Sequence, residues 1–243
     1  MNPGKSFLLI AAMMLCASCQ LGSRTIEGNG KVITRNIEIT DYTKLAIAGS
    51  MDVEYEESSA APFLSVSLDE NLFEYLKAEV DGSTLKIGPK NYGLDGLNIR
   101  ATVFKVKTTS RKLEELGCAG SGNVNARNVS AASSFDVNLS GSGNVSVRQI
   151  SVNSLECNLA GSGDILITGS TAKAEYNLAG SGDIKAADCR AEKAEANIAG
   201  SGNIELHASS TLEASIVGSG DVSYKGTPQV KVNKIGSGKV RSL

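Results

Sequence analysis

The chain has no tryptophan, one histidine and four prolines among its 243 residues, and its aromatic residues are limited to five Phe and six Tyr. The single histidine, His207, excludes metal sites built from several imidazoles and leaves one candidate imidazole base. The net charge is −2 and no block of lysine and arginine is present. This argues against a nucleic-acid partner, because clustered cations are needed to bind phosphate backbones. The scarcity of aromatics predicts a narrow core of small and branched apolar residues.

Residues 1–18 are predicted to be a signal peptide. Lys5 supplies the positive charge, and the apolar run Phe7–Leu15 is too short to span a bilayer. The next residues, Cys16–Cys19, resemble a bacterial lipobox, in which a peptidase cuts before a cysteine that is then acylated. The resemblance implies lipidation of Cys19 and a tether over residues 19–25, although leucine is usual where Cys16 stands. The acyl chains would attach the protein to a membrane without a spanning helix. The alternative is ordinary secretion, with Cys19 as an incidental thiol.

The triplet Gly-Ser-Gly recurs at near-constant spacing. It begins at residues 120, 141, 161, 180, 200, 218 and 236, so that the steps lie between 18 and 21 residues. Two degenerate copies, Gly28–Val32 and Gly49–Val53, precede the series. The long interval between Gly49–Val53 and the triplet at residue 120 predicts an insertion at about 56–116. A repeat of about 20 residues cannot bury its own apolar face, so successive repeats must stack on one another.

Aligned on the first glycine of each triplet, the repeats show fixed columns. Every copy has Val or Ile four positions later, and apolar columns with an asparagine column between them precede the triplet. Alternation with a period of two on both sides of a glycine turn predicts two short strands per repeat, with one face buried. The β-branched column comprises Val124, Val145, Ile165, Ile184, Ile204, Val222 and Val240, and the asparagine column comprises Asn138, Asn158, Asn177, Asn197 and Asn233.

We therefore predict an all-β fold, a right-handed parallel β-helix in which residues 26–243 form one solenoid domain. Gly-Ser-Gly is the corner of each coil, where glycine supplies a positive φ, and the asparagines form an amide ladder. A competing arrangement makes each triplet the tip of a hairpin in an antiparallel prism or propeller. The insertion is predicted to contain strands at 63–66, 84–87 and 99–106. It also contains a short amphipathic helix near 69–80, which covers one open end of the solenoid.

A further column is acidic and is expected on the outer face. Stacked like charges about 4.8 Å apart repel, which would favour a bound cation or a partner. The alternative is a solvated face that prevents aggregation, with Lys173 and Lys193 moderating the repulsion. Calcium binding at the corners is disfavoured, because half of the corner positions where a calcium site would need a carboxylate hold asparagine. The acidic column comprises Glu115, Asp136, Glu156, Glu175, Glu195 and Glu213, with Lys231 in the last copy.

Taken together, these features resemble one family. The repeated Gly-Ser-Gly-[Asn/Asp]-[Val/Ile], the segments Asp-Glu-Asn-Leu at 69–72 and Gly-Ser-Thr-Leu-Lys-Ile at 82–87, and the leader are similar to the DUF2807 family of Bacteroidetes proteins. This family is described as "putative auto-transporter adhesin, head GIN domain". The resemblance covers about residues 26–243. It implies a right-handed β-helix in a cell-envelope lipoprotein, and it implies neither an enzyme nor a known ligand.

The columns show no cluster of residues that breaks their pattern, so no catalytic residue, cofactor or metal site is predicted. His207 falls on the outward phase of its repeat, and Ser121 and its equivalents are turn residues without an accompanying base. After removal of the leader and acylation, the remaining cysteines are Cys118, Cys157 and Cys189. We expect these three to be small core residues rather than disulfide partners.

The predicted function is that of a non-catalytic outer-membrane lipoprotein, on either face of that membrane. As an adhesion or scaffold module it would present a rigid solenoid face to a carbohydrate or protein partner. The alternative is a carbohydrate-active enzyme, a polysaccharide lyase or hydrolase. Such an enzyme would show a deep groove with two carboxylates about 5 to 9 Å apart, whereas a smooth rod favours the module.

Overall fold

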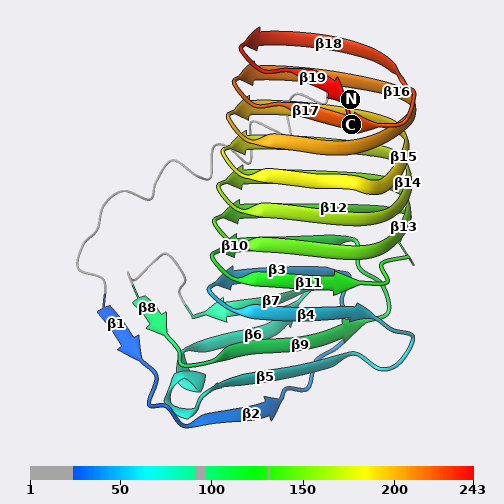
Figure 1. Cartoon of the computed structure of the whole chain (residues 1–243). Coiled ribbons are helices and arrows are strands. Elements are labelled where there is room, and N and C mark those ends of the chain that lie inside the picture. Colours follow the sequence, from blue (N-terminus) through cyan, green and yellow to red (C-terminus); the bar gives the residue numbers. More distant parts are fainter. Residues whose placement is uncertain (1–23, 91–96, 131) are drawn as a thin grey trace.

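The computed structural model describes residues 24–90, 97–130 and 132–243, and these residues form a parallel β-solenoid (Figure 1). The predicted signal peptide and Cys19 lie outside the described residues. The Gly-Ser-Gly repeats form a rising stack of coils. Their strands are β10 (Glu115–Gly120), β11 (Asn123–Arg127), β12 (Ser134–Gly141), β13 (Asn144–Gly161), β14 (Asp164–Gly180), β15 (Asp183–Gly200), β16 (Asn203–Gly218), β17 (Val222–Lys225), β18 (Gln229–Gly236) and β19 (Val240–Ser242).

Successive coils pair in parallel with like residues in register, which confirms the predicted parallel β-helix. Gly120 pairs with Gly141, Gly141 with Gly161, and Gly161 with Gly180. The predicted β-branched column forms one file across the stack, from Val124 to Val240. The antiparallel alternative is therefore excluded for the repeats, because every strand pair among β10 to β19 is parallel.

Both glycines of a triplet are required where the corners stack. The first, Gly161, has a φ of +137°, and a Cβ at this position would lie 2.2 Å from the carbonyl oxygen of Gly141. A Cβ on Gly163 would lie 1.9 Å from the carbonyl oxygen of Gly143. The intervening serine donates its backbone N–H to the corner below, as Ser162 N does to Gly141 O at 3.0 Å. Backbone thus packs directly on backbone at this corner.

The interior of the stack is a narrow apolar column, as the composition predicts. Val145 and Ile165 are completely or almost completely buried. Cys118, Cys157 and Cys189 are buried and unbonded to one another, which confirms their assignment to the core. Burial raises the pKa of the Cys118 thiol to about 11 and that of Cys189 to about 11. These thiols therefore stay protonated and act as packing groups.

The first coil lies below the repeats, and the inserted segment returns beneath it. Strands β3 (Lys44–Gly49) and β4 (Asp52–Glu57) pair in parallel with β10 and β11. On their other edges they pair in parallel with β7 (Thr84–Pro89) and β9 (Phe104–Ser110). The coil that comes first in the sequence is therefore sandwiched between two later segments.

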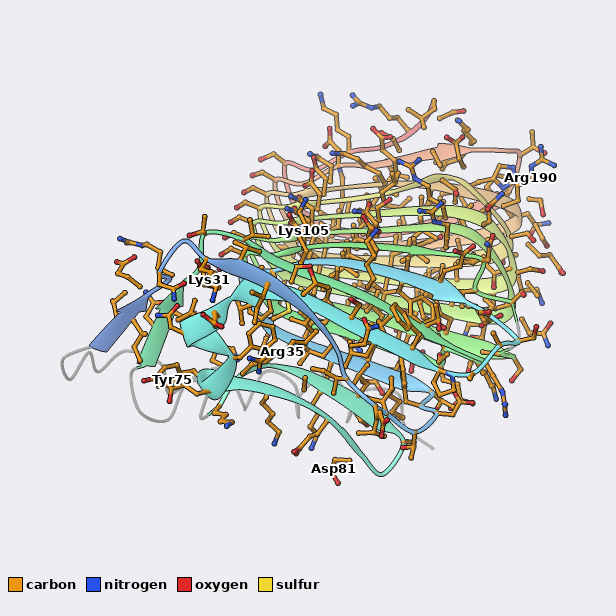
Figure 2. The ribbon with its side chains drawn as sticks, turned by 90° about the horizontal axis from the view of Figure 1, so that it is seen from below. Lys31, Arg35, Tyr75, Asp81, Lys105 and Arg190 are labelled. Carbon is orange, nitrogen blue, oxygen red and sulfur yellow. The ribbon has the colours of Figure 1, made fainter. Side chains whose placement is uncertain are left out.

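Antiparallel strands cover this end of the solenoid. Strand β5 (Phe63–Asp69) pairs with β9, β2 (Val32–Asn36) pairs with β5, and β6 (Leu76–Asp81) pairs with β7. Figure 2 looks onto this covered end, where Arg35 and Tyr75 lie, and the Arg35 guanidinium stacks 4.3 Å from the centroid of the Phe73 ring. Antiparallel pairing terminates the parallel stack and leaves little of its core open.

Three sequence-based expectations need correction. The predicted helix near 69–80 is a 3₁₀ helix, η1 (Glu70–Tyr75), and strand β6 begins directly after it. The apolar residues that indicated a helix belong to two strands. Leu68 lies near the end of the alternating strand β5, and Val80 lies in the next strand, β6. The predicted strand 99–106 is divided between β8 (Leu97–Arg100) and β9, and β8 pairs with β1 (Arg24–Glu27). The degenerate copy Gly28–Val32 is a turn leading into β2, not a coil.

Candidate functional site

An open groove of about 640 Å³ runs along one flank of the solenoid. Six strands contribute to it in spatial order β9, β4, β11, β13, β14 and β15. At a spacing of about 4.8 Å between strands, it extends along the axis for about 24 Å. Its outward polar side chains are Asp52, Glu54, Lys105, Lys107, Asn123, Asn125, Asn144, Ser146, Arg148, Asp164 and Lys185.

The carboxylates of the groove are each paired with a neighbour. Glu54 forms an ion pair with Lys107 at 3.0 Å, and Asp164 forms one with Lys185 at 2.8 Å. Asp52 accepts a hydrogen bond from Asn123 at 2.9 Å. These carboxylates are engaged in structural contacts, and the groove is a flank of the rod rather than a deep cleft.

Two cations of the groove remain available to a ligand. Among the residues that the structure describes, Lys105 and Arg148 form no ion pair within 4.0 Å. Arg148 makes one long contact, from Nε to Ser146 Oγ at 3.4 Å. Beside them the corner amides form a short ladder, in which Asn144 donates to Asn123 at 3.0 Å. The groove thus offers cationic donors and amide groups along a line, which suits an extended polar ligand.

The predicted acidic column exists as a file on the other side of the coil. Its members pair in register, and a lysine stands at each end of the file. Lys44 Nζ lies 2.9 Å from Glu115 Oε2, and Lys231 Nζ lies 2.6 Å from Glu213 Oε1. The sequence identified Lys231 but not Lys44, because only the fold shows that the first coil stacks beneath residue 115.

The asparagine file beside it orients these carboxylates. Asn177 donates one amide hydrogen to Asn158 at 3.0 Å and the other to Glu175 at 3.1 Å. Asn158 and Asn197 repeat this pattern in their coils. Each amide therefore extends the ladder and also hydrogen-bonds to a glutamate of its own coil. This confirms the predicted ladder and favours a structural role for the acidic file.

Asp136 is the most perturbed carboxylate of the acidic file. Burial first, and then the neighbouring carboxylates of Glu156 and Glu115, raise its pKa to about 6 against the opposing effect of Lys44. No group of three His, Cys, Asp or Glu residues within the described ranges could hold a metal ion. Repulsion between its stacked carboxylates is thus the main electrostatic property of the acidic file.

Asp69 is an anchoring residue that the sequence did not reveal. It is fully buried, and its Oδ1 accepts from Gly30 N at 2.8 Å while its Oδ2 accepts from Thr102 N at 2.7 Å. Burial alone would raise the pKa of this carboxyl, but the backbone donors outweigh burial and lower it. The carboxylate thus ties the turn before β2 to the segment between β8 and β9.

His207 is not part of any catalytic arrangement that the structure describes. It pairs in register with Arg190 on one side and Lys225 on the other. Its Nδ1 is buried and has no hydrogen-bond partner. Flanked by two cationic residues, this imidazole lacks the oriented acid that a catalytic histidine needs.

Within the described ranges no helix has the length and hydropathy required to cross a bilayer.

Comparison with known proteins agrees with this architecture. A solved structure from Parabacteroides distasonis ATCC 8503, named as a putative lipid binding protein, is 41% identical, covers 90% of this chain and 100% of its own, and has a TM-score of 0.76. A putative adhesin from Parabacteroides merdae ATCC 43184 is 30% identical, with 90% and 99% coverage and a TM-score of 0.68. A putative adhesin from Bacteroides fragilis NCTC 9343, 24% identical over 90% of this chain and 100% of its own, shares the fold with a TM-score of 0.81.

No curated protein matches the chain. The model of the family described as "Putative auto-transporter adhesin, head GIN domain" matches residues 41–228, which include both the first coil and the repeats. This match spans more than half of the chain, and it includes the strands that build the groove and the acidic file. The chain therefore belongs to the DUF2807 family.

Proposed function

We propose that this protein is a non-catalytic, adhesion-like module of the cell envelope, which binds an extended carbohydrate or protein segment along the groove between β9 and β15. The observation that carries the proposal is the line of donors and acceptors displayed by six stacked strands, in which Lys105 and Arg148 take part in none of the ion pairs among the described residues. Backbone stacking holds these side chains at a fixed spacing, so little ordering entropy is lost on binding. The names of the related structures, adhesins and a lipid binding protein, support a binding role rather than a catalytic one.

The test is binding of the purified chain to a glycan array and to an array of extended peptides. We expect selective binding that falls at least tenfold in the variant Lys105→Glu/Arg148→Glu, because two donors of the groove are reversed in charge. The matched control is Lys173→Glu/Lys193→Glu, which changes two lysines beside the acidic file and leaves the groove intact. Release of a shorter glycan product would support the enzyme alternative, and binding that is equal in both variants would place the ligand elsewhere.

We further propose that acylation of Cys19 tethers the module to the outer membrane. The support is the leader, in which a short apolar run precedes Cys16–Cys19. Growth with labelled palmitate should label the wild-type protein and leave Cys19→Ser unlabelled and unattached to membranes. Cys16→Ser is the matched control and should retain the label. Incorporation of label into Cys19→Ser would contradict the assignment.

A further inference from the structure

The two ends of the solenoid differ. The end formed by the insertion is covered by β2, β5 and β6, whereas at the other end β18 pairs with β16 and β19 pairs with β17, with no further strand from the described residues on them (Figure 1). All eight residues of β18 are exposed. Within the described ranges, no strand pairs with the outer edge of β18. This edge therefore presents backbone donors and acceptors that another strand can use.

The apolar interior is also open at this end. Val230 continues the core file above Leu212, and Val232 continues it above Ala214, yet these valines are 39% and 42% exposed. Ile235, on the outward phase, is 74% exposed. One more strand laid on β18 would bury Val230 and Val232 in the same way that β18 covers the residues of β16. The surface is thus an unfinished layer of core together with an unpaired edge.

The charged side chains of the last coil are cationic, and acids from earlier in the chain pair with three of them: Lys225 with Asp188, Lys231 with Glu213 and Arg241 with Asp221. Residues 222–243 contain five of the 24 Lys and Arg residues and none of the 26 Asp and Glu residues. Lys231 lies on the outward side of β18, and Lys234 occupies a core position above Ile216, where its Nζ donates to Gly238 O at 3.2 Å. A strand that covered Lys234 with an apolar residue would bury its ammonium group without a carboxylate partner, which is costly. Any added strand must therefore supply acidic groups.

A second copy of this chain does not meet that requirement. Two such ends brought together would oppose cation to cation. The edge strand at the covered end, β2, contains Arg35 and no acidic residue, so it cannot supply a carboxylate to Lys231 or Lys234 either. A lipid surface would match the charge, but it would not pair with the eight-residue edge. The occupant that satisfies the edge, the open valines and the lysines is an acidic strand.

We propose that the outer edge of β18 binds an extended segment of another protein, with apolar residues above Val230 and Val232 and acidic residues above Lys231 and Lys234, which adds one strand to the solenoid. In parallel register the added residue above Lys231 is acidic, so this lysine bridges the new carboxylate and Glu213. The residue above Val232 is apolar and completes the core. Backbone pairing supplies affinity, and the order of apolar and acidic side chains along the added strand supplies specificity.

The chain itself offers a probe of this chemistry. A synthetic peptide that copies residues 211–221 with the change Ile216→Glu has the required pattern, because in the register that β16 keeps with β18 it places Glu213 above Lys231 and a second carboxylate above Lys234. With a fluorescent label its binding to the whole chain can be followed by anisotropy. We expect saturable binding that weakens at least tenfold for Lys231→Glu/Lys234→Glu and at high salt. Lys77→Glu/Lys86→Glu, which changes two lysines at the covered end of the solenoid, is the control and should bind as the wild type does.

Two modified peptides keep the test decisive if Lys231→Glu/Lys234→Glu loosens the last coil. A peptide with Glu213→Lys and Ile216→Lys tests charge, and a peptide N-methylated at alternate amides tests backbone pairing. Each should lose at least tenfold in affinity for the unmodified chain. Equal affinity for the N-methylated peptide, or no binding at millimolar peptide, would overturn the proposal. Sedimentation with phosphatidylglycerol vesicles but not phosphatidylcholine vesicles, without peptide binding, would assign the surface to anionic lipid instead.

Discussion

Lys44 Nζ lies 2.9 Å from Glu115 Oε2 although the two residues are 71 positions apart. The pair joins the first coil to the repeats and terminates the acidic file at its lower end. The carboxylate of Glu115 raises the pKa of Lys44 by accepting its hydrogen bond. Since the pair is partly exposed, its main effect is expected to be electrostatic balance rather than a large contribution to stability.

Reversing this charge should destabilise the protein in a salt-dependent manner. In Lys44→Glu a seventh acid joins the file, and we expect the midpoint of thermal unfolding to fall by about 2–4 °C at low salt. At about 0.5 M NaCl most of the loss should disappear, because screening shortens the range of the repulsion. Circular dichroism melts at two salt concentrations provide the measurement.

The neutral variant Lys44→Gln is the matched control for this prediction. It removes the ion pair without adding a negative charge, so the fall in melting temperature should be smaller than for Lys44→Glu. If both variants lose the same amount at every salt concentration, packing of the lysine stem rather than charge decides the effect.

The corner glycines should tolerate no side chain. Gly161→Ala places a Cβ 2.2 Å from Gly141 O at a φ of +137°, so the coil must separate from its neighbour. We expect the free energy of unfolding to fall by at least about 3 kcal/mol, measured as a lower urea midpoint. Gly82→Ala is the control, since Gly82 also has a positive φ, +62°, but nothing lies within 4 Å of its Cβ position. The control should lose only about 1 kcal/mol, and equal losses would contradict the role of stacking.

The sequence predicts the repeats well because each structural requirement recurs in them. Gly161 is stacked between Gly141 and Gly180, and Val145 lies between two other β-branched residues. The columns of the sequence therefore specify the register as well as the fold. The insertion has no such redundancy. Nothing local to Lys105 shows that β9 returns to pair with β4, and the groove that this pairing completes was missed for that reason. The helix predicted over 69–80 is a shorter 3₁₀ helix, because two alternating strands on either side of it imitate helical spacing.

The amide ladder has a gap that can be filled. Gly117 lies between Ala46 and Asn138 in the asparagine file, and a Cβ there would meet only Leu45 O at 3.8 Å. Gly117→Asn should extend the ladder by accepting from the amide of Asn138, and it also removes a flexible glycine from a strand. We expect a gain of about 1 kcal/mol in the free energy of unfolding.

Gly117→Ala separates the two contributions to that gain. It removes the flexible glycine without supplying an amide, so it should give only part of the increase in the urea midpoint. If the alanine variant gains as much as the asparagine variant, the hydrogen bond adds nothing and the ladder is a consequence of the register rather than a source of stability.

Asp136 makes stability depend on pH in an unusual direction. Its pKa is about 6 in the folded protein and the ordinary value is 3.8, so between these values the folded state holds a proton that the unfolded state has released. The free energy of unfolding therefore falls as pH rises through this window and stays reduced above it. Asp136→Asn removes the penalty and should be more stable than the wild type at pH 8, by about 1–2 kcal/mol.

This difference should vanish near pH 4, where the wild-type carboxyl is protonated in the folded protein. Asp188→Asn is the control of opposite sign, because a hydrogen bond from Lys225 lowers the pKa of Asp188, and its loss should reduce stability at pH 8. Urea midpoints at pH 4, 6 and 8 distinguish the two variants. A loss of stability in Asp136→Asn at pH 8 would mean that the ionised carboxylate is engaged in a favourable contact, and the repulsion along the acidic file would then be too weak to govern the pH dependence.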